Sequence, residues 1–282
     1  MKRILSALVL CLTSLAATVL ASPMSGASVP ENAASLDAAL RRLYSFDFRG
    51  SSEKLAEYTS ANAADPLGHA LRASGLLFEE LNRMNLLGRE FITDNEKIEK
   101  KDRPQSDTGA RRRFAEAVAE TRARAGAALE KDPRDRNALL ALCIAVGAER
   151  DYAALVEKRM RASMEYVKES QGFALRLLKV DPSAYDAYVT TGFSEYLLGS
   201  LPFFLKWFVK VDGAQGNKEA GLKQLESAAE RGRYLKPFAQ LLLANFYLRE
   251  KKPEQTRKWL RELAREYPEN KLFQAELAKL GD

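Results

Sequence analysis

The chain has 282 residues, 46% of them hydrophobic and 29% charged, so it can bury a sizeable core and is unlike a disordered tail. It contains two cysteines and one histidine, which excludes a disulfide framework and a zinc site built from clustered Cys and His. Glycine and proline are scarce while Ala, Leu, Glu, Lys and Arg recur, and this composition favours helices over strands.

The first 21 residues have the pattern of a secretory signal peptide. Lys2 and Arg3 precede an apolar run that ends in small residues at Ala21, and we expect cleavage there. An uncleaved anchor is the alternative, because about 18 apolar residues can just span a bilayer. Residues 22–34, rich in Ser, Pro, Asn and Ala, are expected to form a flexible leader. The sequence therefore predicts a periplasmic or secreted protein whose helical domain covers residues 35–282.

The charge balance argues against a nucleic-acid partner. The formal net charge is +6, and cleavage would remove two of the 44 basic residues and none of the 38 acidic ones. No basic stripe interleaved with aromatics is visible, and residues 111–113, three consecutive arginines, are expected to be a solvated helix start.

Prolines punctuate the chain at recurring places. Pro66, Pro133, Pro182 and Pro268 each follow a helical pattern and precede another, which is where proline ends one helix and allows the next to begin. The residues around them resemble the tetratricopeptide repeat (TPR), in which a period of about 34 residues forms two antiparallel helices, A and B. The resemblance covers roughly residues 36–270. It is closest in the last unit, at Leu243, Ala244, Tyr247, Thr256, Leu260, Leu263 and Pro268.

The resemblance implies an all-α fold, a TPR-like right-handed solenoid of about four helical hairpins. An irregular helical array without TPR geometry is the alternative. The intervals between the prolines exceed the repeat, and the non-periodic surplus covers residues 82–113, 148–162 and 199–216. We expect this surplus in the turns between helices A and B, along one edge of the array, where insertions usually serve binding.

TPR proteins bind along a concave surface lined by one face of the A helices. Carried over to this sequence, that face is largely apolar and includes Leu77, Ile144, Val189, Phe193, Tyr196, Phe238 and Leu241. Polar residues expected at its rim are Glu80, Asn137, Tyr152, Asp186, Lys206, Asn245 and Arg249. An apolar surface of this kind has to be covered, because large exposed apolar patches are rare unless they are functional.

The candidate cover is the third surplus stretch, residues 201–211, which contains Phe203, Phe204 and Trp207. It can pack into the protein's own groove, act as a lid over an apolar ligand, or lie on a membrane surface with its lysines at the headgroups. It is too short to span a bilayer.

Catalysis is not expected. Cys143 occupies a small-residue packing position of the repeat, so a Cys143–His69 dyad is disfavoured and the thiol is expected to be buried and inert. Carboxylate pairs such as Glu79 with Glu80, or Asp186 with Glu195, lack the accompanying Trp-rich subsites of a glycosidase. We expect neither cofactor nor metal.

The sequence favours a non-catalytic scaffold that binds a protein or peptide in the cell envelope. The alternative is a carrier of an apolar small molecule or lipid, similar to the TPR-like components associated with TRAP transporters. An enzyme is the third alternative, and peripheral membrane contact is a further possibility.

Overall fold

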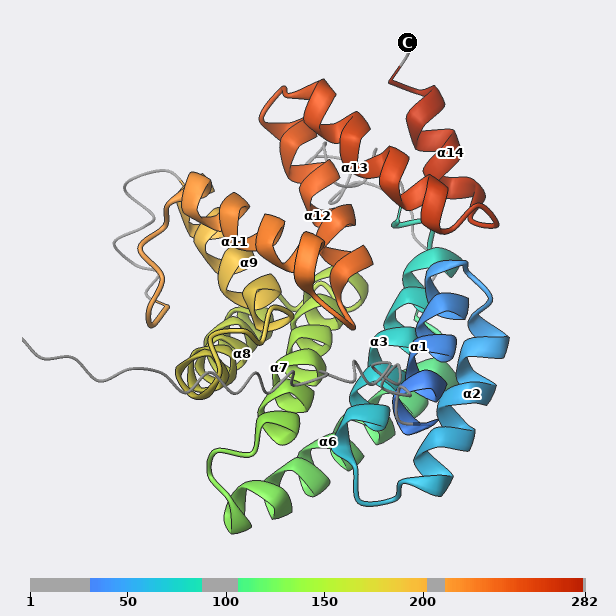
Figure 1. The fold of residues 1–282 in the computed structure, drawn as a ribbon, viewed down its shortest axis with the longest axis vertical. Coiled ribbons are helices and arrows are strands. Elements are labelled where there is room, and N and C mark those ends of the chain that lie inside the picture. The colour runs from blue at the N-terminus through green and yellow to red at the C-terminus, as the bar shows by residue number, and fades with distance from the viewer. Residues whose placement is uncertain (1–30, 88–105, 202–210, 281–282) are drawn as a thin grey trace, which may run out of the picture.

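The computed structural model describes residues 31–87, 106–201 and 211–280, and every regular element in these ranges is helical (Figure 1). The all-α prediction is confirmed for this part of the chain. The elements are α1 (Glu31–Tyr44), α2 (Phe48–Ala61), α3 (Pro66–Arg83), α6 (Thr108–Lys131), α7 (Arg136–Asp151), a π-helical turn η1 (Tyr152–Val156), α8 (Met160–Val180), α9 (Ala187–Ser200), α11 (Lys218–Arg231), α12 (Lys236–Arg249), α13 (Pro253–Glu266) and α14 (Lys271–Ala278).

Most helix starts follow from a short polar side chain placed just before them. The side chains of Asp47, Asp65, Asp107, Asp135, Asn217 and Asn270 each accept a backbone N–H of the helix that follows. Such caps satisfy donors that have no partner within the helix.

Consecutive helices pack in pairs: α1 with α2, α3 with α6, α7 with α8, α9 with α11, and α12 with α13, while α14 packs on α13. The described residues thus contain five pairs, one more than expected. The fourth pair has no closing proline. Its second helix, α11, ends at Gly232, where a Cβ would lie 2.5 Å from the carbonyl oxygen of Ala228.

One surplus stretch differs in structure from the prediction. Residues 148–156 form the end of α7 and the turn η1, a short turn follows at residues 157–159, and α8 begins at Met160, so the surplus lies between the two helices as expected but most of it is helical. The surplus lengthens both antiparallel helices together, which keeps them packed, and Ala148, Tyr152 and Val156 are buried. The other two stretches also lie between the two helices of a pair, but residues 88–105 and 202–210 fall outside the described part. The first helix starts at Glu31, inside the stretch expected as leader.

Close helix crossing in the fourth pair requires glycine. A Cβ at Gly221 of α11 would lie 2.6 Å from the backbone nitrogen of Tyr196, and a Cβ at Gly192 of α9 would lie 2.8 Å from the carbonyl oxygen of Gly221. The two backbones therefore touch, which leaves no room for a side chain at either position.

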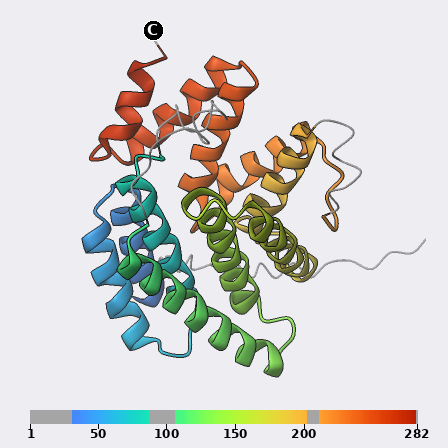
Figure 2. The same cartoon turned by 180° about the vertical axis from the view of Figure 1, so that it is seen from behind.

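The array closes on itself, because the first and last helical pairs meet. The Tyr44 ring of α1 packs at 5.7 Å from that of Tyr267, its hydroxyl donates to the carbonyl oxygen of Tyr234 at 3.2 Å, and its own carbonyl accepts from Asn270 Nδ2 at 2.8 Å. In both ribbon views α12 occupies the middle of the molecule, between α9 and α11 on one side and α1 and α3 on the other (Figures 1 and 2).

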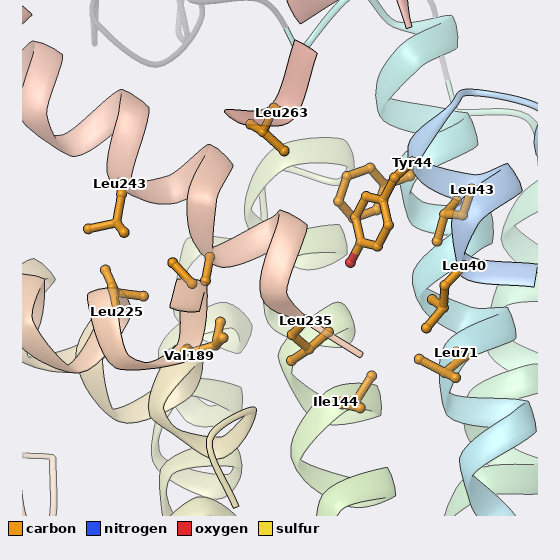
Figure 3. Packing of buried hydrophobic residues seen from close by; sticks show 14 of the residues in the cluster. Leu40, Leu43, Tyr44, Leu71, Ile144, Val189, Leu225, Leu235, Leu243 and Leu263 are labelled. Atoms are coloured by element: carbon orange, nitrogen blue, oxygen red, sulfur yellow. The ribbon is translucent and has the colours of Figure 1, made fainter. Parts of the chain in front are cut away.

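Figure 3 shows the result from close by. Leu40, Leu43 and Leu71 approach from α1 and α3, Ile144 and Val189 from α7 and α9, and Leu225, Leu235, Leu243 and Leu263 from the last pairs, with Tyr44 between them. One large apolar cluster therefore joins helices from every pair. None of the described helices is both long and apolar enough to cross a membrane.

Candidate functional site

The residues expected to line a concave groove lie inside the molecule. Leu77, Ile144, Val189 and Tyr196 are buried, while Phe193, Phe238 and Leu241 are half-buried against the central cluster. The apolar face of the first helices is covered by α12, where Phe238 meets the Phe78 ring edge-on at 5.6 Å. This part of the chain therefore leaves no open groove there.

The expected cover, residues 201–211, contributes little that can be described. Phe203, Phe204, Lys206 and Trp207 lie outside the described residues. The flanking Leu201 and Val211 pack with Val167 and Leu198 in a separate small cluster between α8 and α9. The covering helix is α12, which lies far along the chain from the helices it covers.

A small cavity remains at the centre. Its volume is about 40 Å³, and its lining includes Tyr44, Phe78, Ile144, Leu235 and Phe238. A volume of this size has room for a few water molecules at most, whereas pockets for small organic ligands measure about 300–1,000 Å³.

Three acidic residues that the sequence offered as rim or acid–base groups anchor the backbone. The buried Asp186 accepts the N–H groups of Arg233, Tyr234 and Leu235 at 3.2, 3.0 and 2.8 Å. Leu235 is the N-cap residue of α12 and has no side-chain acceptor of its own. Burial raises the pKa of Asp186 above its ordinary value, although these hydrogen bonds oppose the rise.

Glu195 and Glu80 hold later N-cap residues in the same way. Glu195 accepts the N–H groups of Gln215 and Asn217 at 2.9 and 2.8 Å, just before α11. Glu80 accepts the N–H of Asp107 at 3.2 Å, just before α6, and two bonds from Arg83 at 2.8 Å each. Burial works against ionisation of Glu80, but these hydrogen bonds hold its pKa below the ordinary value. All three carboxylates therefore serve as structural hydrogen-bond acceptors that hold the backbone before a later helix.

The remaining rim residues divide between surface and interior. Asn137 and Arg249 are exposed, and Asn137 Nδ2 donates to Asp65 Oδ1 at 2.6 Å. Asn245 is buried and donates to the carbonyl oxygen of Leu241 at 2.9 Å. Tyr152 is also buried, although it lines a pocket described below.

The possible nucleophile is enclosed. Cys143 is 1% exposed, its sulfur lies 3.1 Å from Thr190 Oγ1, and burial raises the pKa of the thiol to about 11. His69 is buried in α3, its ring nitrogens have no hydrogen-bond partner, and burial followed by nearby arginines lowers its pKa. The two residues do not form a dyad. Among the described residues, no group of three or more potential metal ligands comes together.

Two larger pockets open at the surface. One, of 410 Å³, lies where the first and last pairs meet and is lined by polar residues such as Asn82, Asn85 and Glu269. The other, of 290 Å³, lies between α6, η1 and α8, and we call it the lateral trough. Its lining residues are Arg111, Phe114, Ala115, Val118, Ala119, Arg122, Glu149, Tyr152, Ala153, Glu157, Arg159 and Tyr166.

One face of α6 forms a wall of the lateral trough. Its six lining residues recur at helical spacing from Arg111 to Arg122, which at 1.5 Å per residue spans about 16 Å. The floor is aromatic, since the rings of Phe114 and Tyr152 stack at 4.3 Å with an interplanar angle of 15°. The Tyr152 hydroxyl lies 3.0 Å from Ser106 Oγ, and this hydrogen bond holds the ring in its position.

Ion pairs bound the lateral trough at its two ends. At one end Glu157 pairs with both Arg111 and Arg159 at 2.9 Å. At the other, Arg122 lies between Glu149 at 2.5 Å and Glu169 at 2.6 Å. Burial raises the pKa of Glu149, with Arg122 opposing the rise.

Sequence analysis named Tyr152 as a rim residue and placed the surplus stretch 148–162, which supplies one wall of this pocket, on a binding edge, but it did not identify the face of α6. The apolar positions of α6 recur at helical spacing, but the alanines among them are equally typical of helix packing. The chain matches no known protein-family model, and no curated protein is significantly similar to it.

Proposed function

We propose that the protein is an exported, non-catalytic TPR-like scaffold that binds a protein or peptide partner in the cell envelope. The observation that carries this proposal is the filled centre. The described interior leaves a cavity of about 40 Å³ where a carrier of an apolar solute needs a chamber of several hundred.

The last pair supports the TPR-like geometry. Six positions that match the repeat lie buried between α12 and α13, each at 7% exposure or less: Leu243, Ala244, Tyr247, Thr256, Leu260 and Leu263. Thr256 Oγ1 also donates to the carbonyl oxygen of Ala244 across the pair at 3.1 Å. The small residue of the first helix and the hydroxyl of the second therefore meet directly.

A scaffold role suits a closed, rigid array. Helices joined through one cluster present their outer faces in fixed positions, so a partner binds without the cost of ordering the surface. The candidate acids and the one described thiol are occupied or enclosed, which favours binding over catalysis.

The test separates a scaffold from a carrier. The mature chain, purified from its own host under native conditions, is examined by native mass spectrometry. A scaffold gives the mass of the bare chain or of its complex with a polypeptide, and this complex re-forms from the separately purified components. A stoichiometric small apolar adduct would support the carrier instead.

A further inference from the structure

We propose that the lateral trough is the partner-binding surface, and that it takes an acidic peptide segment carrying one large apolar side chain. This inference rests on the proposed scaffold function and names its site and partner class. The occupant's apolar side chain fills the middle of the trough, and its carboxylates lie at the end formed by Arg111 and Arg159.

The middle of the trough has the size and surface of a side-chain pocket. Its 290 Å³ lie over the stacked rings of Phe114 and Tyr152, with the half-buried Tyr166 on α8 facing them. Ala115 and Ala119 are exposed on α6, so the wall is low and accessible. An aromatic or long aliphatic side chain gains both apolar burial and ring contact on such a floor.

The fold brings two basic runs together at one end of the trough. Residues 111–113 lie at the end of the first turn of α6 and in its second turn, and Lys158, Arg159 and Arg161 surround the start of α8. Glu157 bridges the runs by pairing with both Arg111 and Arg159, whose side chains stay 60% and 56% exposed. One carboxylate facing two guanidinium groups leaves this end positive.

The acidic residues that contact these runs are fewer than the basic residues in them. Asp107 caps α6 through the N–H of Ala110, and Glu116 lies beside Arg112 on the neighbouring turn. The N-cap of α8 is Arg159, whose side chain makes no capping bond, so the positive end of that helix adds to the local field. An acidic segment is the complementary partner.

The opposite end gives the site a direction. There Arg122 is held by Glu149 and Glu169, two carboxylates against one guanidinium. A bound segment is therefore oriented with its acidic residues toward Arg159 and its neutral residues toward Arg122.

An exposed apolar residue lies next to Arg159, at the basic end of the trough. Met160, the first residue of α8, is 60% exposed. Among the described residues, it is the one large apolar side chain that is exposed to solvent. Adaptable methionines are common at peptide-binding surfaces. The recessed floor distinguishes this site from a membrane-contact patch, because a flat headgroup layer does not reach the bottom of a pocket between α6 and α8.

The test uses three labelled peptides and the full mature chain, with binding followed by fluorescence anisotropy. The first peptide has four acidic residues, then a tryptophan, then neutral residues. The second replaces the tryptophan with serine, and the third replaces the acids with lysines. We expect the first to bind at least about tenfold more tightly than either of the others.

Two substitutions on α6 locate the site. Ala119→Trp fills the trough and should weaken binding of the first peptide about tenfold or more, whereas Ala127→Trp, exposed two turns further along, should leave it unchanged. Arg159→Glu should weaken binding and reduce its salt dependence. Far-ultraviolet circular dichroism checks that each variant is folded, and Ala115→Trp replaces Ala119→Trp if it is not.

Several results would overturn the inference: equal binding of the three peptides, no binding of the first, or no effect of a folded Ala119→Trp. Flotation with phosphatidylglycerol–phosphatidylcholine vesicles that is lost on Arg159→Glu but kept by Ala119→Trp would assign the patch to a membrane surface. If a polypeptide partner from the host still binds folded Ala119→Trp undiminished, the scaffold function stands and only its assignment to the trough fails.

Discussion

Replacing Asp186 tests whether this buried acid is a structural anchor or a binding residue. Its carboxylate accepts three backbone N–H groups just before α12, the helix that fills the centre of the molecule. In Asp186→Ala these donors lose their acceptor inside a packed region. The substitution should therefore loosen the start of α12 without touching the exposed surface.

The magnitude follows from the geometry. Three bonds to a charged acceptor at about 1.5 kcal/mol each give about 4.5 kcal/mol. Removing the carboxylate returns part of the cost of burying its charge, so we expect a net loss of about 3 kcal/mol. Asp186→Asn keeps an oxygen at the position that serves Tyr234 and Leu235 but places an amide against the N–H of Arg233, and should cost about 1 kcal/mol.

Urea denaturation followed by circular dichroism measures both changes as differences in the free energy of unfolding. Glu230→Ala, which removes an exposed acid from α11, is the matched control and should change stability by less than about 0.5 kcal/mol. An Asp186→Ala protein within about 1 kcal/mol of the parent would refute the anchor role.

Gly221→Ala places a Cβ 2.6 Å from the backbone of Tyr196 and should lower the free energy of unfolding by about 2 kcal/mol. Its control, Gly126→Ala, lies in a helix with nothing within 4 Å of the new Cβ and should raise that free energy by about 0.5 kcal/mol. Equal urea midpoints for the two variants would contradict the close crossing. The buried Cys143 thiol, with its pKa raised to about 11, should react with a thiol reagent at neutral pH only after unfolding, and prompt labelling of the native mature chain would argue against an enclosed thiol. Because the folded-state pKa of Glu80 lies below the unfolded value, its stabilising contribution is present above pH 4.5 and is lost as the pH falls through the folded pKa. Glu80→Gln should therefore flatten the acid limb of the stability profile, and an unchanged limb would count against this role.

Local features were predictable from the sequence. Apolar periodicity and Asp-Pro punctuation locate the helix boundaries, and the residues around Thr256 and Leu263 predict the pair α12 and α13. These patterns work because caps, prolines and helix faces act over a few residues.

Long-range features were not predictable. Tyr44 and Asn270 meet although they are widely separated in the chain, and no local pattern in either segment reports the contact. The sequence showed an apolar face on the first helices. Which segment of the chain covers that face depends on how the helical pairs curve, and no local pattern reports this. The sequence pointed to residues 201–211 as a cover, most of which lie outside the described residues, and did not identify α12.

The acidic residues show a second limit. Asp186 and Glu80 look like any surface acid in the sequence, and only the arrival of a later N-cap residue shows that each is buried and used. The α6 face of the lateral trough was missed for a related reason, because in the sequence Ala119 cannot be distinguished from an alanine that packs against a neighbouring helix.

The central claim is that the first and last helical pairs meet around a filled centre, which leaves binding to the outer surface. Small-angle X-ray scattering of the mature chain tests it most directly. A closed array of this length should have a radius of gyration of about 18–19 Å with a single compact distance distribution. A clearly larger radius with an elongated distribution would show an open solenoid whose concave face is free, and would contradict the account.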